Sequence, residues 1–144
     1  MKCLIVGTGE MAHALTHQYT QTIHATHKSR YELVIASPTR QFIPGSVFHD
    51  MAPFVDITDG LRVADIIVLA IPGEFLPSFV EQYAEWMIMG DTAKIVIDIH
   101  NNDHRSNNTT ASAEETFRKH DLCWVKGLND VGAVDLLSRS KSNK

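Results

Sequence analysis

The strongest constraint on the fold is a series of short apolar runs in which polar residues do not alternate. The longest run covers residues 65–71 and is closed by Pro72-Gly73. A continuous apolar run of this length is typical of a parallel strand that is covered on both faces. Comparable runs predict further strands at residues 2–6, 31–36, 94–99 and 122–126, and a short alternating segment predicts one more at 54–58.

Helical segments separate these runs. After the first run, apolar residues recur every three or four positions, which predicts an amphipathic helix that begins near Glu10. Asp59 is expected to cap a brief helix that ends at Val63. Further helices are expected at residues 75–89, 111–120 and 131–137. This alternation predicts an α/β fold, a three-layer doubly wound parallel sheet (Rossmann fold) in a single domain.

Size and composition agree with one domain. The chain has 144 residues and a formal net charge of −4, and we expect a domain at residues 1–137 followed by a polar flexible tail at 138–144. The mild acidity predicts no nucleic-acid partner. No apolar run reaches the roughly 18 residues that cross a bilayer, so no membrane partner is expected.

The two cysteines indicate the compartment. Cys3 lies within the first apolar run, so a disulfide framework is not expected, and a reducing, cytoplasmic location follows. Cys123 stands beside Trp124 in a predicted strand, and we expect it to belong to the core.

The first strand is followed directly by a G-x-G-x-x-A element, Gly7 to Ala12, which opens the first helix. Gly7 permits a tight turn, Gly9 lets the backbone approach a pyrophosphate, and Ala12 lets the helix pack closely on the strand. Free N–H groups and the helix dipole then favour phosphate. The alternative is a simple glycine turn. A dinucleotide site here would use Gly7, Thr8, Gly9, Glu10 and Met11.

The end of the second predicted strand indicates which dinucleotide binds. NAD-preferring sites place a carboxylate there, whereas an arginine accommodates a 2′-phosphate. This chain has no carboxylate there and offers the hydroxyls of Ser37 and Thr39 and the guanidinium of Arg40. NADP is therefore the expected cofactor. The alternative is that Ser37-Pro38 only ends the strand and that Arg40 is a solvated charge.

Two further segments follow the central strands. Ligands of doubly wound sheets lie outside the carboxyl ends of the strands, so these segments are expected to flank the ribose and nicotinamide. The first is Ala70, Ile71 and Pro72, and the second begins with His100 and Asn101. Pro72 would supply a rigid rim, or it would only end the strand. His100 would relay a proton beside the nicotinamide, or it would only bind its loop.

Four segments resemble one protein family. They are residues 4–15 (LIVGTGEMAHAL), 64–72 (ADIIVLAIP), 96–101 (VIDIHN) and 125–133 (VKGLNDVGA). Together they are similar to the NADP-binding domain of the coenzyme F420 (deazaflavin)-dependent NADP reductases, which is related to STEAP-type and pyrroline-5-carboxylate reductase amino-terminal domains. The resemblance extends to about Leu137. We expect the last strands and closing helix of the family domain to be absent from these 144 residues.

This resemblance implies a function and its residues. Phosphate-loop positions of the family fall on residues 8–11, the 2′-phosphate positions on Ser37 and Arg40, and the nicotinamide-side positions on Ile71, Pro72 and Asn101. It implies hydride transfer between NADP(H) and an unidentified second substrate, with a deazaflavin- or flavin-like acceptor as one candidate. The alternative is a non-catalytic dinucleotide-binding or sensing module that needs a partner for activity. No catalytic side chain is assigned.

Within the span of the resemblance, the sequence departs from the family at two places. Pro38 and Thr39 separate Ser37 from Arg40, and Gly127-Leu128 replaces the usual Ala-Phe before an asparagine.

Four histidines fall on the predicted first helix. His13, His17, His24 and His27 fall on one side of that helix and predict a solvated histidine-rich face. Metal binding is the weaker alternative, because no cysteine or carboxylate accompanies them at a characteristic spacing, so no metal site is assigned. An exposed edge strand is one reason for a homodimer.

Overall fold

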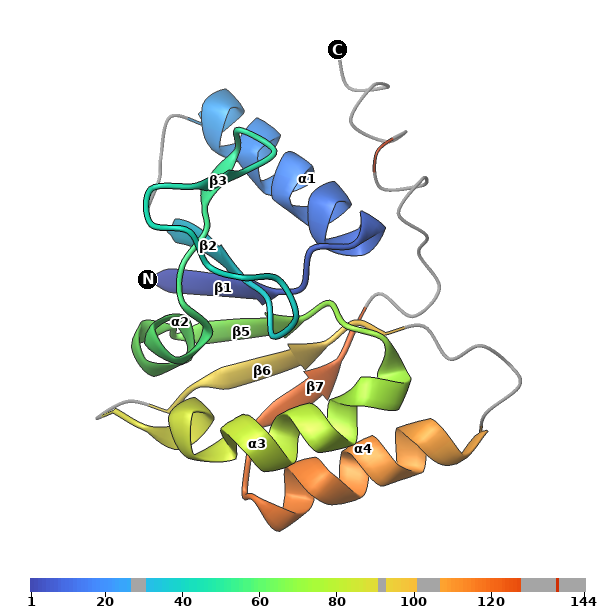
Figure 1. The fold of residues 1–144 in the computed structure, drawn as a ribbon. Helices are drawn as coiled ribbons and strands as arrows, with labels where there is room; N and C mark the ends of the chain where they lie inside the picture. Colours follow the sequence, from blue (N-terminus) through green and yellow to red (C-terminus); the bar gives the residue numbers. More distant parts are fainter. Residues whose placement is uncertain (27–30, 91–92, 101–106, 128–136, 138–144) are drawn as a thin grey trace.

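A computed structural model describes residues 1–26, 31–90, 93–100, 107–127 and 137. Its main feature is a five-stranded sheet of order β2-β1-β5-β6-β7, in which every neighbouring pair is parallel (Figure 1). The strands are β1 (Lys2–Val6), β2 (Glu32–Ala36), β5 (Ile66–Leu69), β6 (Ile95–Asp98) and β7 (Trp124–Lys126). The predicted doubly wound parallel sheet is confirmed.

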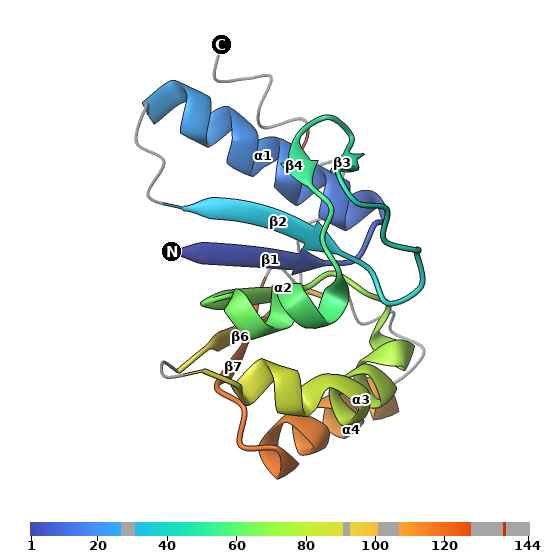
Figure 2. The same cartoon turned by 60° about the vertical axis from the view of Figure 1, so that its left-hand side comes forward.

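Helices cover both faces of this sheet. Helix α1 (Glu10–Thr26) lies on one face, while α2 (Ile57–Val63), α3 (Leu76–Ile88) and α4 (Asn107–Lys119) lie on the other (Figure 2). A 3-10 turn, η1 (Gly73–Phe75), leads into α3. From β1 the chain winds outward to β2, then returns to β5 on the opposite side of β1. The direction in which strands are added to the sheet therefore reverses between β1 and β5, and this place is the topological switch point of the sheet.

Two separate cores explain why the strands carry no polar alternation. Leu4 and Val6 belong to the larger core under α2, α3 and α4, whereas Ile5 between them belongs to the core under α1. In β2, Val34 likewise belongs to the larger core, and Leu33 belongs to the core under α1. Because successive strand residues point to opposite faces, a sheet covered on both faces needs apolar residues at every position.

The segment between β2 and α2 differs from the prediction. A small antiparallel hairpin, β3 (Val47–Phe48) and β4 (Ala52–Pro53), packs over α1, and the predicted strand at 54–58 is wrong. Only Phe54 of that segment makes a bridge, to Ile35.

Asp56 explains why the strand does not form. Its Oδ1 accepts hydrogen bonds from the backbone N–H groups of Thr58 (3.0 Å) and Asp59 (3.3 Å), which starts α2 at Ile57. These bonds lower the pKa of Asp56, the hydroxyl bond from Thr58 having the largest effect. The prediction that Asp59 is the cap is wrong, since Asp59 lies in the first turn of the helix.

Lys94 closes the other end of α2. Its buried ammonium donates hydrogen bonds to the carbonyls of Leu61 (2.7 Å), Arg62 (2.6 Å) and Ala64 (3.0 Å). Burial lowers the pKa of Lys94, and Asp65 partly offsets this shift. The terminal carbonyls of a helix have no partner within the helix, so Lys94 satisfies them from the neighbouring strand segment.

The cysteines differ in their exposure. Burial raises the pKa of the Cys3 thiol from 9.0 to about 11. Cys123 is exposed, so the prediction that it belongs to the core is wrong. It precedes the edge strand β7, and the aromatic ring beside it, Trp124, instead packs on Phe117 with ring centroids 5.0 Å apart.

We expect iodoacetamide at about pH 8 to alkylate Cys123 and to leave Cys3 unmodified in the folded protein. The thiolate is the nucleophile, and Cys3 remains a thiol well above that pH. Peptide mass spectrometry measures both sites, and the same reaction in guanidinium chloride, where both should react, is the control. Equal modification of the two cysteines in the folded protein would contradict this account.

The described part of the chain contains no helix that is both long and apolar enough to cross a membrane.

Candidate dinucleotide-binding site

Gly7 joins three neighbouring strand ends. Its N–H donates to the carbonyl of Ala36 (2.8 Å), and the N–H of Ala70 donates to the carbonyl of Val6 (2.8 Å). Gly7 has φ +129°, and a Cβ there would collide with the Ala70 carbonyl. This position therefore needs glycine for both its conformation and its close packing.

The turn then opens directly into α1. The carbonyl of Gly9 accepts the N–H of His13 (3.0 Å), so Gly9 is the cap residue of the helix. A Cβ at Gly9 would meet no atom within 4 Å. The backbone beside Gly9 thus faces open space at the amino end of a helix, which is the arrangement that favours phosphate.

A first cleft of about 420 Å³ lies at this edge of the sheet. One wall is the glycine turn and the turn after β2, and the opposite wall is one side of α3. Phe79 and Tyr83 on that helix have ring centroids 4.8 Å apart. The lining residues are Gly7, Thr8, Gly9, Ser37, Pro38, Thr39, Ala70, Ile71, Pro72, Phe75, Ser78, Phe79, Gln82 and Tyr83.

Sequence reasoning missed the α3 wall. Its signal was present, because aromatic residues at positions 75, 79 and 83 recur at the four-residue spacing that places side chains on one helix side.

The turn after β2 is organised by Ser37. Its buried Oγ accepts the backbone N–H groups of Thr39 (3.3 Å) and Arg40 (3.1 Å) and lies 3.3 Å from the Thr39 hydroxyl. Ser37 and Thr39 line the first cleft, but Arg40 is not among the lining residues of either cleft. The Arg40 guanidinium lies over the ring of Phe54, 5.5 Å from its centroid.

A second cleft of about 230 Å³ adjoins the first. It shares Gly9, Ala70, Ile71 and Pro72 with the first cleft, so the two meet at the switch point between β1 and β5. Its own lining residues are Glu10, Met11, Gly73, Ile99 and His100. The structure therefore brings together every predicted site residue except Arg40 and Asn101, and Asn101 lies outside the described residues.

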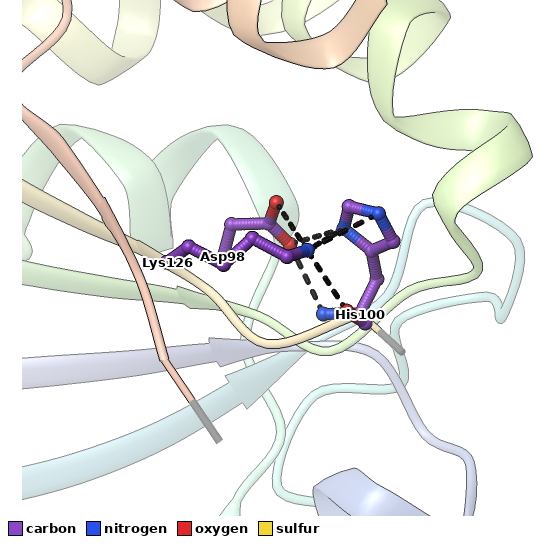
Figure 3. A network of polar contacts seen from close by, with 3 residues as sticks. All are labelled: Asp98, His100 and Lys126. Atoms are coloured by element: carbon purple, nitrogen blue, oxygen red, sulfur yellow. Dashed lines mark hydrogen bonds and ion pairs between the residues drawn. The ribbon is translucent and has the colours of Figure 1, made fainter. Parts of the chain in front are cut away.

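His100, which lines the second cleft, belongs to a buried polar network with Asp98 and Lys126 (Figure 3). Asp98 Oδ1 accepts the backbone N–H (3.0 Å) of His100 and lies 2.6 Å from its Nδ1. Lys126, at the end of β7, donates to Asp98 Oδ2 (3.3 Å) and to the carbonyl of His100 (2.9 Å). Its Nζ also lies 3.2 Å from His100 Nε2. Asp98 and the His100 side chain are almost fully buried.

The backbone at Gly73 packs closely against the His100 imidazole. A Cβ at Gly73 would lie 2.5 Å from Cδ2 and 3.0 Å from Nε2 of His100. Sequence reasoning singled out His100 but missed Lys126, which is 26 residues away and reaches His100 only because β6 and β7 are neighbours.

The histidines of α1 differ from the predicted solvated face. His13 and His17 are half-buried, and the His13 ring lies 4.4 Å from the His49 ring of the hairpin. Partial burial, followed by the nearby His49 and His17, lowers the pKa of His13. The His24 side chain and His27 lie outside the described residues. Among the described residues, no three His, Cys, Asp or Glu side chains gather as metal ligands would.

The parallel strand order, the switch point and the glycine turn into α1 define a Rossmann-type domain. Residues 2–102 match the family described as NADP oxidoreductase, coenzyme F420-dependent. The chain belongs to this family.

Solved structures share this fold. A candidate F420-dependent NADP reductase from Arthrobacter sp. FB24 is 21% identical with a TM-score of 0.63, and the match covers 93% of this chain and 64% of that one. The Myxococcus stipitatus imine reductase, solved with NADP+, is 16% identical with a TM-score of 0.59 over 88% of this chain and 40% of that one.

The Bacillus cereus imine reductase BcSIRED is 13% identical, with a TM-score of 0.60 over 87% of this chain and 39% of that one. The chain thus spans less than two thirds of each of these three structures. No curated protein matched the sequence.

Proposed function

We propose that this chain is the NADP(H)-binding domain of an oxidoreductase. The observation that carries the proposal is the pair of joined clefts, which meet at Gly9 and residues 70–72 on the switch point of the sheet. Ligands of doubly wound folds bind in this crevice. The family to which the chain belongs is described as using NADP.

The two clefts suit the two halves of a dinucleotide. The pyrophosphate would lie against the backbone of Thr8, Gly9 and Glu10 at the start of α1. The first cleft would hold the adenosine half, with its base against the aromatic side of α3. The second cleft would hold the nicotinamide half, between Pro72 and the wall formed by His100.

The turn after β2 supports NADP over NAD. The Ser37 and Thr39 hydroxyls lie at the first cleft, and residues 36–41 contain no carboxylate that would repel a 2′-phosphate. Arg40 would have to leave Phe54 to join them.

The reaction proposed is hydride transfer between the nicotinamide and a second substrate, for which a deazaflavin or flavin is the leading class. The bound nicotinamide supplies the hydride chemistry, so the residues of the chain bind, orient and shield the ring. Pro72 limits how far the ring can move, and Ile71 and Ile99 present apolar surface that excludes water.

Ser37→Asp is expected to weaken NADPH binding by about 100-fold and to strengthen NADH binding, because a carboxylate repels the 2′-phosphate and accepts the 2′-hydroxyl. Aspartate can still accept the two backbone N–H groups that Ser37 accepts, so the turn is retained. Isothermal titration calorimetry of the unaltered chain and of Ser37→Asp, each with NADPH and with NADH, measures the effect.

Ser46→Asp is the matched control. It adds the same charge at a serine that lines neither cleft. It should lower NADPH affinity by no more than about threefold. Equal losses in the two variants would place the 2′-phosphate elsewhere, and no NADPH binding by the unaltered chain would refute the proposal.

Turnover separates an oxidoreductase from a binding module. NADPH oxidation is followed at saturating NADPH with deazaflavin, flavin and ferric acceptors in turn. Oxidation with one of them supports the proposed reaction, whereas tight NADPH binding without oxidation supports a dinucleotide-sensing module.

A further inference from the structure

The wall of the second cleft includes one titratable ring, that of His100, whose Nδ1 lies close to both a carboxylate and an ammonium group behind the wall. Asp98 and Lys126 each contact His100, and their carboxylate and ammonium also contact each other at 3.3 Å. The side chains of Asp98 and His100 are 1% and 2% exposed, and that of Lys126 is 15% exposed. Since the two charges offset each other, a proton added to His100 contributes a net positive charge to this wall.

Among the described residues, two further charged side chains lie near this ring. Glu10 lines the same cleft from the start of α1, and Glu74 is exposed in the turn that carries Gly73. Carboxylates and lysine ammonium groups ordinarily keep their charge between about pH 6 and 8, whereas histidine is the side chain that changes charge in this range. A change in the protonation of His100 would therefore change the charge of this wall by one unit.

The two oxidation states of the cofactor differ by one charge at the ring that the second cleft would hold. The nicotinamide of NADP+ is a cation, and that of NADPH is neutral. A positive charge on the cleft wall thus repels one state and spares the other, and the repulsion is strengthened because the wall is buried.

We propose that the protonation of His100 sets the preference of this site between NADP+ and NADPH. Protonated His100 disfavours NADP+, and neutral His100 admits both states. By linkage, NADP+ binding then releases a proton that NADPH binding does not. The proposal rests on the proposed function, because it requires the nicotinamide to occupy the second cleft.

The test measures the dissociation constants of NADP+ and NADPH by calorimetry at about pH 6 and about pH 8, in freshly prepared solutions. The 2′-phosphate also titrates near pH 6, but both states carry it, so its contribution cancels in the ratio of the two constants. We expect the ratio Kd(NADP+)/Kd(NADPH) to rise about tenfold from pH 8 to pH 6.

His100→Asn removes the titration and retains an amide donor that can face Asp98. Its ratio should be the same at both pH values. His13→Asn is the matched control, because His13 is a half-buried histidine outside both clefts, and its ratio should rise as in the unaltered chain. If His100→Asn does not fold, as judged by circular dichroism, His100→Gln takes its place.

The outcomes separate the two proposals. A pH-independent ratio in the unaltered chain, or a pH-dependent ratio in the His100 variant, overturns the role of His100 while NADP(H) binding stands. Failure of the unaltered chain to bind either state at both pH values refutes the proposed function itself.

Discussion

Gly9→Ser is expected to weaken NADPH binding by on the order of 100-fold and to leave the folded protein intact. Apart from its two chain neighbours, a Cβ at Gly9 meets no atom of the described residues within 4 Å, so the new side chain would occupy the space that the pyrophosphate would use. Serine is also a favourable cap residue, so the start of α1 is retained.

Calorimetry with NADPH and urea unfolding measure the two effects of Gly9→Ser separately. The free energy of unfolding should stay within about 1 kcal/mol of that of the unaltered chain. Unchanged NADPH affinity would show that the phosphates do not approach this turn.

Gly7→Ala, unlike Gly9→Ser, is expected to destabilise the folded protein. It should lower the free energy of unfolding by about 3 kcal/mol or more. Alanine at φ +129° is strained, and its Cβ collides with the carbonyl of Ala70 on the neighbouring strand β5. Urea unfolding followed by circular dichroism measures this loss.

Gly45→Ala separates the two causes. Gly45 also has a positive φ, +78°, but a Cβ there meets nothing within 4 Å, so only strain remains, at a cost of about 1 kcal/mol. If Gly7→Ala were no more destabilising than Gly45→Ala, the close approach of the glycine turn to β5 would be wrong.

The doubly wound parallel sheet could be predicted from the sequence because burial on both faces leaves a strong signal. Within the run at 65–71, residues 66–71 are all apolar, and helical periodicity separates such runs. The hairpin β3–β4 has two residues in each strand, too few to produce a period, and its turn relies on positive φ at His49 and Asp50. Asp56 and Asp59 are both plausible caps, and only the hydrogen bonds distinguish them.

The candidate site likewise has features that the sequence predicts and features that it does not. The glycine turn could be predicted because the function proposed for it requires a fixed spacing directly after a strand. The stacking of Arg40 on Phe54 and the contact of Lys126 with His100 join residues that are distant in sequence. Such contacts depend on which strands become neighbours, so local patterns cannot reveal them.

A crystal structure with bound NADPH tests the central claim most directly. The account predicts the pyrophosphate at Thr8, Gly9 and Glu10, the 2′-phosphate at Ser37 and Thr39, and the nicotinamide in the second cleft beside His100. A dinucleotide bound away from the switch point between β1 and β5, or no bound dinucleotide in crystals saturated with NADPH, would contradict it.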